Sequence, residues 1–75
     1  MRLGQAAALS VRALTPKQRQ MVVLLAKGHS HKEIADLLAL TEAGVRFLVC
    51  GAYKQLNVKR ATQAVIVAAA GGLIA

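Results

Sequence analysis

The side chains of this 75-residue chain that could take part in chemistry are one cysteine, two histidines and a large excess of cations. Cys50 has no histidine placed to activate it in a recognisable nucleophile motif. His29 and His31 stand two residues apart, a spacing that points them to different sides of a helix, and no cysteine or acid completes a metal-ligand set with them. We therefore expect no catalytic site, no metal site and no cofactor.

The cations indicate the kind of partner. Ten Lys and Arg against three Asp and Glu give a formal net charge of +7, and in a small chain this excess favours a polyanionic partner, most commonly nucleic acid. The alternative is that the charge only keeps an apolar chain in solution. A lone cysteine fits a reducing compartment, and Arg12 interrupts the apolar N-terminal run before it reaches the length of a signal peptide. We expect a cytoplasmic protein.

Two helix starts of the same chemical kind flank a glycine turn. The segment from Thr15 to Gln18 combines an N-cap hydroxyl, a proline at the first helical position and an amide three residues after the cap. Ser30 and Glu33 form a second capping box, and the pair Lys27-Gly28 between the boxes is typical of a helix end. With the helical run that follows, the pattern predicts a helix-turn-helix unit.

Apolar residues recur at helical spacing through four runs. Helices are predicted over 16–26, with Met21, Val22 and Leu25 inward, and over 31–39, with Ile34, Ala35 and Leu38 inward. A third helix opens at Thr41-Glu42 and turns four residues to the core: Val45, Val49, Ala52 and Leu56. A fourth helix spans 61–70. Upstream, the weak stripe of Leu3, Ala7 and Val11 indicates either a short helix or a linker arm, because Gly4 and Ser10 weaken the helical pattern.

The face of the third helix opposite its core residues is the candidate reading surface. It carries Ala43, Arg46, Phe47, Cys50, Gly51 and Lys54, with Tyr53 nearer its edge. Backbone amides at the capped helix N-termini are fixed donors for phosphate. Cations at helix starts, at the far end of the third helix and in the loop that follows it are candidate phosphate contacts: Lys17, Arg19, Lys32, Lys54, Lys59 and Arg60. An exposed apolar cluster around Phe47 leaves a second use open, because such patches often mark a protein partner.

With these elements placed, the chain resembles the LuxR/GerE-type domain, a four-helix DNA-binding domain found at the C-terminus of many bacterial response regulators and quorum-sensing regulators. The resemblance covers Leu14 to Ile74 and implies that the third helix enters the major groove while the other helices support it. It rests on short motifs at characteristic spacing: Leu14-Thr15-Pro16, Leu25-Ala26-Lys27-Gly28, Lys32-Glu33-Ile34-Ala35 with Leu38, Thr41-Glu42, Val45-Arg46, Leu56-Asn57-Val58 and Thr62-Gln63-Ala64-Val65.

Family positions that meet base edges correspond to Arg46, Phe47 and Cys50. The Arg46 guanidinium can donate two hydrogen bonds to the O6 and N7 atoms of guanine, whereas Phe47 offers only apolar contact, as with a thymine methyl, and Cys50 is a weak donor. Modest sequence selectivity follows. The expected DNA-contacting set is Lys17, Lys32, Thr41, Ala43, Arg46, Phe47, Cys50, Lys54, Lys59 and Arg60.

The fourth helix has no polar face after its first turn, which predicts burial on more than one side. Val65, Ile66 and Ala69 are assigned to the core, and the remaining side, formed by Ala64, Val67 and Ala68, is assigned to a partner. The resemblance also implies that this helix often pairs two copies on a two-fold DNA site. We expect a homodimer through this helix, or the same surface packed on another domain. The alternative is an alanine-rich surface helix, which alanine's high helix propensity tolerates.

Together these patterns predict an all-α protein, with an N-terminal arm or short helix over 1–13 and a small four-helix helix-turn-helix domain over 14–75. The expected function is that of a dimeric transcriptional regulator that binds double-stranded DNA and has no enzyme activity. The apolar tail is about a dozen residues, short of the roughly 20 that a spanning helix needs, so no membrane association is expected.

The alternative function is a degenerate helix-turn-helix domain that binds another regulatory protein, as an antagonist or adaptor, in place of a specific operator. No receiver or ligand-binding domain accompanies the unit within these 75 residues, so we expect control through abundance.

Overall fold

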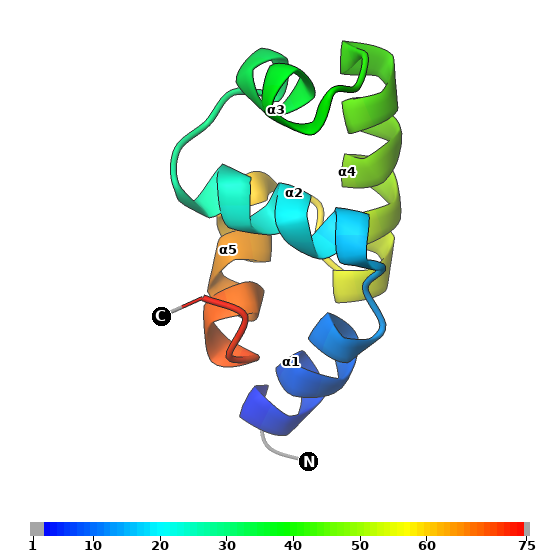
Figure 1. Ribbon diagram of the computed structural model, residues 1–75. Coiled ribbons are helices and arrows are strands. Elements are labelled where there is room, and N and C mark those ends of the chain that lie inside the picture. Colours follow the sequence, from blue (N-terminus) through cyan, green and yellow to red (C-terminus); the bar gives the residue numbers. More distant parts are fainter. Residues whose placement is uncertain (1–2, 75) are drawn as a thin grey trace.

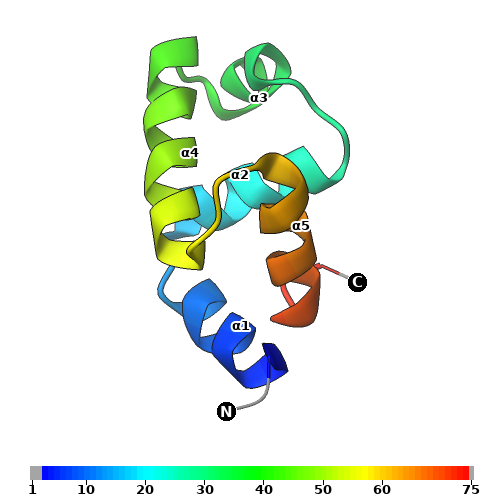
Figure 2. The same ribbon diagram turned by 180° about the vertical axis from the view of Figure 1, so that it is seen from behind.

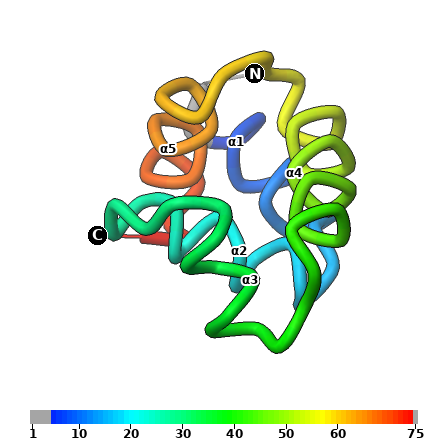
Figure 3. The backbone as a smooth tube through the Cα atoms, turned by 90° about the horizontal axis from the view of Figure 1, so that it is seen from above, coloured from blue at the N-terminus to red at the C-terminus, as the bar shows by residue number. Residues whose placement is uncertain are grey.

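Within residues 3–74, which the computed structural model describes, the chain folds into five α-helices (Figure 1). They are α1 (Leu3–Arg12), α2 (Pro16–Ala26), α3 (His31–Leu38), α4 (Glu42–Leu56) and α5 (Ala61–Ala70). The helix α2 crosses the middle of the molecule, with α3 above it and α1 and α5 below. Seen from above, α4 and α5 stand on opposite sides (Figure 3). The prediction of an all-α helix-turn-helix domain is confirmed.

Both predicted capping boxes form and fix the helix starts. The Thr15 hydroxyl accepts a hydrogen bond from the Gln18 amide at 3.2 Å, and the Gln18 side-chain oxygen accepts one from the Thr15 amide at 2.9 Å. Ser30 and Glu33 repeat this exchange at 3.2 Å and 2.9 Å. Gly28 takes a φ of 90°, a left-handed conformation that favours glycine, directly after α2. The predicted boundaries of α2 follow from this local chemistry.

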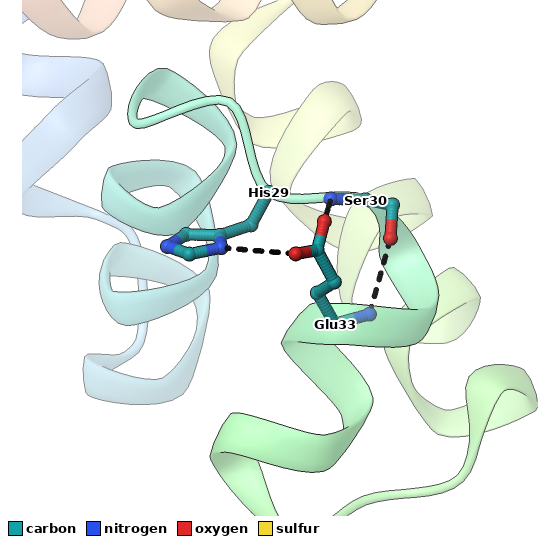
Figure 4. A network of polar contacts seen from close by, with 3 residues as sticks. All are labelled: His29, Ser30 and Glu33. Carbon is teal, nitrogen blue, oxygen red and sulfur yellow. Dashed lines mark hydrogen bonds and ion pairs between the residues drawn. The ribbon is translucent and has the colours of Figure 1, made fainter.

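A histidine lies beside the capping box of α3 (Figure 4). One oxygen of the Glu33 carboxylate accepts the Ser30 amide, and the other lies 3.8 Å from Nδ1 of His29. The hydrogen bonds with Ser30, and then the charge of His29, lower the pKa of Glu33 below its ordinary value. The ionised carboxylate is therefore the form that the folded chain favours.

Acid is expected to remove the contribution of Glu33 to stability. Because its pKa is lowered in the folded chain, this contribution is present above the unfolded-state pKa of about 4.3 and is lost as the pH falls through the lower folded-state value. Urea unfolding of the wild type and Glu33→Gln should therefore show the wild type as the more stable at neutral pH, with the difference shrinking on acidification. A difference that stays constant across this range would contradict the expectation.

The N-terminal segment is a helix, so the short-helix alternative for this part of the chain is the correct one. Ala7 and Val11 of α1 are buried, whereas the side chain of Leu3 lies outside the described part of the chain. A Cβ atom on Gly71 would lie 2.7 Å from the Ala7 carbonyl oxygen and 2.7 Å from Cγ2 of Val11. The absence of a side chain at Gly71 thus lets α1 approach the end of α5, as seen from behind in Figure 2.

The core is one cluster of buried residues to which all five helices contribute. Met21, Val22 and Ile34 are fully buried in it, and the four inward positions predicted for α4 are all buried. Leu25 and Leu38 are partly buried against this cluster. None of the helices over residues 3–74 is long and apolar enough to cross a lipid bilayer.

The buried and exposed faces of α5 are the reverse of those predicted. Ala64 and Ala68 have no exposed surface and Val67 is half-buried, whereas Ile66 is 64 % exposed. The expectation that Ala64, Val67 and Ala68 form an open partner surface is therefore wrong for the two alanines. In a helix without a polar face, the sequence pattern does not indicate which side is buried. In the folded chain the small alanines, not the larger Ile66, take the inner positions.

Candidate nucleic-acid interface

The connection between α3 and α4 holds the two helices of the unit at a fixed angle. Ala39 ends α3 in the left-handed conformation with a φ of 55°, and the Leu40 amide donates to the Ala35 carbonyl at 2.8 Å. Thr41 then caps α4, because its hydroxyl accepts a hydrogen bond from the Gly44 amide at 3.0 Å. In Figures 1 and 2 the helix α4 runs along one edge of the molecule.

One face of α4 is open along its length. Ala43, Arg46, Phe47, Cys50 and Lys54 are exposed there, and Phe47 is 79 % exposed. Their spacing of three, four, seven and eleven residues places them along one side of a helix. The structure therefore brings the predicted reading residues together on one surface, opposite the buried residues of α4.

Arg46 pairs with an acid one turn earlier in α4. Its Nη2 atom lies 3.7 Å from Oε2 of Glu42, and the two side chains are 69 % and 48 % exposed. The sequence pattern was used to place Glu42 only at a helix start, and its pairing with Arg46 was not predicted. The signal was present in the sequence, because residues four apart on a helix are neighbours.

The start of α2 packs against the middle of α4. Nε2 of Gln18 lies 2.7 Å from the place that a Cβ atom on Gly51 would take. Gln18 is also the residue that closes the capping box of α2. The contact therefore fixes the N-terminus of α2, and with it the exposed Lys17, beside the open face of α4.

The remaining predicted phosphate contacts come from three elements and are all exposed. Lys32 lies in the first turn of α3, Lys54 in the last turn of α4, and Lys59 and Arg60 in the loop between α4 and α5. The Lys59 amide donates to the Gln63 side-chain oxygen at 3.0 Å, which ties this loop to α5. Exposed cations are thus carried by α3, by the last turn of α4 and by the loop that follows α4.

Arg19 differs from its predicted use. Its Nε and Nη2 atoms both donate to the Leu14 carbonyl oxygen at 3.2 Å, so two of the donors expected to meet phosphate hold the α1–α2 connection instead. This contact spans five residues and reaches outside the helix, a geometry that helical spacing does not indicate.

Cys50 and Tyr53 lie one turn apart on α4. Burial, and to a lesser degree the nearby Cys50, raises the pKa of Tyr53, so its hydroxyl stays neutral at physiological pH. Over the part of the chain that the structure describes, no three His, Cys, Asp or Glu side chains gather closely enough to hold a metal ion.

A helix-turn-helix unit whose second helix presents an open face among cations is the architecture by which many proteins bind nucleic acid. Residues 12–68 match the family model described as bacterial regulatory proteins, luxR family. The chain belongs to this family.

The chain is also similar to the transcriptional regulatory protein ComA of Bacillus subtilis (strain 168). The two are 31 % identical over 61 residues, which make up 81 % of this chain and 28 % of ComA. The chain therefore spans less than a third of the length of this relative.

Proposed function

We propose that this protein is a transcription regulator that binds double-stranded DNA with α4 in the major groove. The observation that carries the proposal is the open face of α4, where Arg46, Phe47 and Lys54 are exposed while the opposite face is buried. Membership of the luxR family and the similarity to ComA, a transcriptional regulatory protein, support it.

In this proposal the contacts on the open face of α4 divide into two kinds. Arg46 donates to the O6 and N7 atoms of guanine, and Phe47 packs on a thymine methyl. Lys17, Lys32, Lys54, Lys59 and Arg60, together with the exposed Thr41 and the amides at the start of α4, hold phosphates and set the register. Ala43 and Cys50 fill the surface between these contacts, so most of the binding energy comes from the DNA backbone.

DNA binding is expected to be strongly salt-dependent and to weaken predictably when these cations are removed. Fluorescence anisotropy with a labelled duplex should show log affinity falling linearly with log salt, and Lys54→Ala should reduce the slope by about 0.9 because one phosphate contact is lost. Arg46→Ala should reduce discrimination between guanine and other bases by about 1–3 kcal/mol. Lys27→Ala, at the end of α2 away from α4, is the matched control. Wild-type protein that shows no salt-sensitive binding would refute the proposal.

We further infer that two copies pair through α5, on a face centred on Ile66 and not on the buried alanines. Ile66 is 64 % exposed, and its exposed neighbours Thr62, Ala69 and Ala70 carry no charge. An uncharged face around a large aliphatic side chain is suited to a two-fold interface, because the same patch can cover itself.

A second function is favoured by one observation. Phe47 is the most exposed large hydrophobic side chain of the described residues, and such a side chain suits a protein partner. In this alternative the open face of α4 binds another regulatory protein. The salt titration separates the two functions, because a face used only for protein binding gives no salt-sensitive association with DNA.

A further inference from the structure

We propose that Glu42 is a positioning residue that makes Arg46 a selective reader of guanine and not a general phosphate contact. The inference rests on the proposed DNA binding and adds to it a determinant of specificity. It starts from the geometry of one ion pair on the open face of α4.

The pair balances the charge of Arg46 without using its hydrogen-bond donors. The separation of 3.7 Å between Nη2 and Oε2 is longer than an N–H···O hydrogen bond, which spans about 2.7–3.2 Å. Across residues 3–74, the Arg46 side chain makes no hydrogen bond to another protein group beside this ion pair. A guanidinium has five N–H donors, so a charge-neutral pair presents free donors to the groove.

The ion pair with Glu42 changes which DNA group Arg46 prefers, because it offsets the charge of Arg46. An arginine alone is attracted to any phosphate, and such contacts carry no sequence information. The carboxylate of Glu42 removes most of this attraction and repels phosphate oxygens. The major-groove edge of guanine is uncharged and offers two acceptors, so it can receive the free donors while the ion pair stays in place.

Glu42 stands apart from the other two acidic residues of the chain. Glu33 is held in the capping box of α3, and Asp36 is also on α3. Glu42 is the acid on the reading helix. A carboxylate in the first turn also stabilises a helix N-terminus, and a test must separate that structural effect from positioning.

Two substitutions make this separation. Glu42→Gln removes the charge, whereas Glu42→Asp keeps the charge at the helix N-terminus and shortens the reach towards Arg46 by one methylene. Each variant is titrated with a duplex that the wild type selects from a random-sequence pool, and with a copy in which its guanines are replaced by adenines. Asp36→Asn, which removes an acidic charge from α3, is the control, and circular dichroism checks that helix content is unchanged.

Glu42→Gln is expected to bind a mixed-sequence duplex about threefold more tightly at about 50 mM salt than the wild type does, with a salt slope steeper by about 0.9. Its preference for the guanine duplex should fall by roughly threefold or more. Glu42→Asp should lose a similar share of that preference while keeping nearly the wild-type salt slope. Asp36→Asn should keep the preference.

Wild-type guanine preference in both Glu42 variants would overturn the inference and leave the proposed DNA binding intact. Wild-type protein without salt-sensitive binding would overturn both, and this outcome appears before any substitution is made. The two failures are therefore distinguishable.

Discussion

Sedimentation of the Ile66→Glu variant is expected to give a monomer at concentrations where the wild type sediments as a dimer. Ile66 is the large exposed side chain on α5, so in the proposed dimer its replacement would place a carboxylate at the centre of an apolar contact. Burying an unpaired charge is strongly unfavourable. The monomer should also lose the gain from joining two binding modules, so its affinity for a duplex with two half-sites should fall by roughly 10²- to 10⁴-fold.

The matched control is Leu37→Glu, which makes the same change at a side chain of α3 that is 58 % exposed. This variant should sediment as the wild type does. Comparing one half-site with two separates self-association from the charge effect on DNA, because only the two-site duplex depends on the dimer. Wild type and Ile66→Glu sedimenting as the same species would rule out pairing through this face.

Replacing Gly71 by valine is expected to lower the free energy of unfolding by about 1–3 kcal/mol or more and to separate α1 from α5. Already a Cβ atom at this position would lie 2.7 Å from the Ala7 carbonyl oxygen and 2.9 Å from the Ala7 carbonyl carbon. These are backbone atoms, so no side-chain rotation can make room. A chain of this size is marginally stable, and a loss of this magnitude should be large on thermal melting.

Ala70→Val provides the control, because Ala70 is exposed at the end of the same helix. It carries the lower helix propensity of valine, up to about 0.7 kcal/mol, without the contact to α1. Equal unfolding free energies for the two variants would show that α1 does not depend on the close approach at Gly71.

The helix boundaries of the domain were predictable because they depend on neighbours in the sequence. Thr15 and Ser30 find their capping partners three residues later, whatever the rest of the chain does. The open and buried faces of α4 were predictable for a related reason, since its apolar residues keep one helical period. Arg46 and Phe47 are therefore exposed as the pattern indicates.

The arrangement of α1 and α5 could not be predicted in the same way. After its first turn α5 has no polar residue to mark the outer side, and the position of Ile66 depends on which neighbours pack on the alanines. The contact of α1 with Gly71 joins the two ends of the chain. Helical periodicity carries no information about such a contact.

Contacts of the candidate site that join different segments of the chain could not be predicted from the sequence either. Arg19 binds the carbonyl of Leu14, outside its own helix, and Gln18 reaches Gly51 of α4. Both depend on how helices meet in space. The Glu42–Arg46 pair lies within one helix, so its spacing was readable once both residues were placed on the exposed face.

The contact between Gln18 and Gly51 limits how the reading face can be redesigned. A larger residue at position 51 would require the end of the Gln18 side chain, which closes the capping box of α2, to shift. Arg46, Phe47 and Cys50 are exposed and carry no such constraint. A library that varies these three positions and keeps glycine at position 51 would explore new base preferences without loosening the scaffold that presents them.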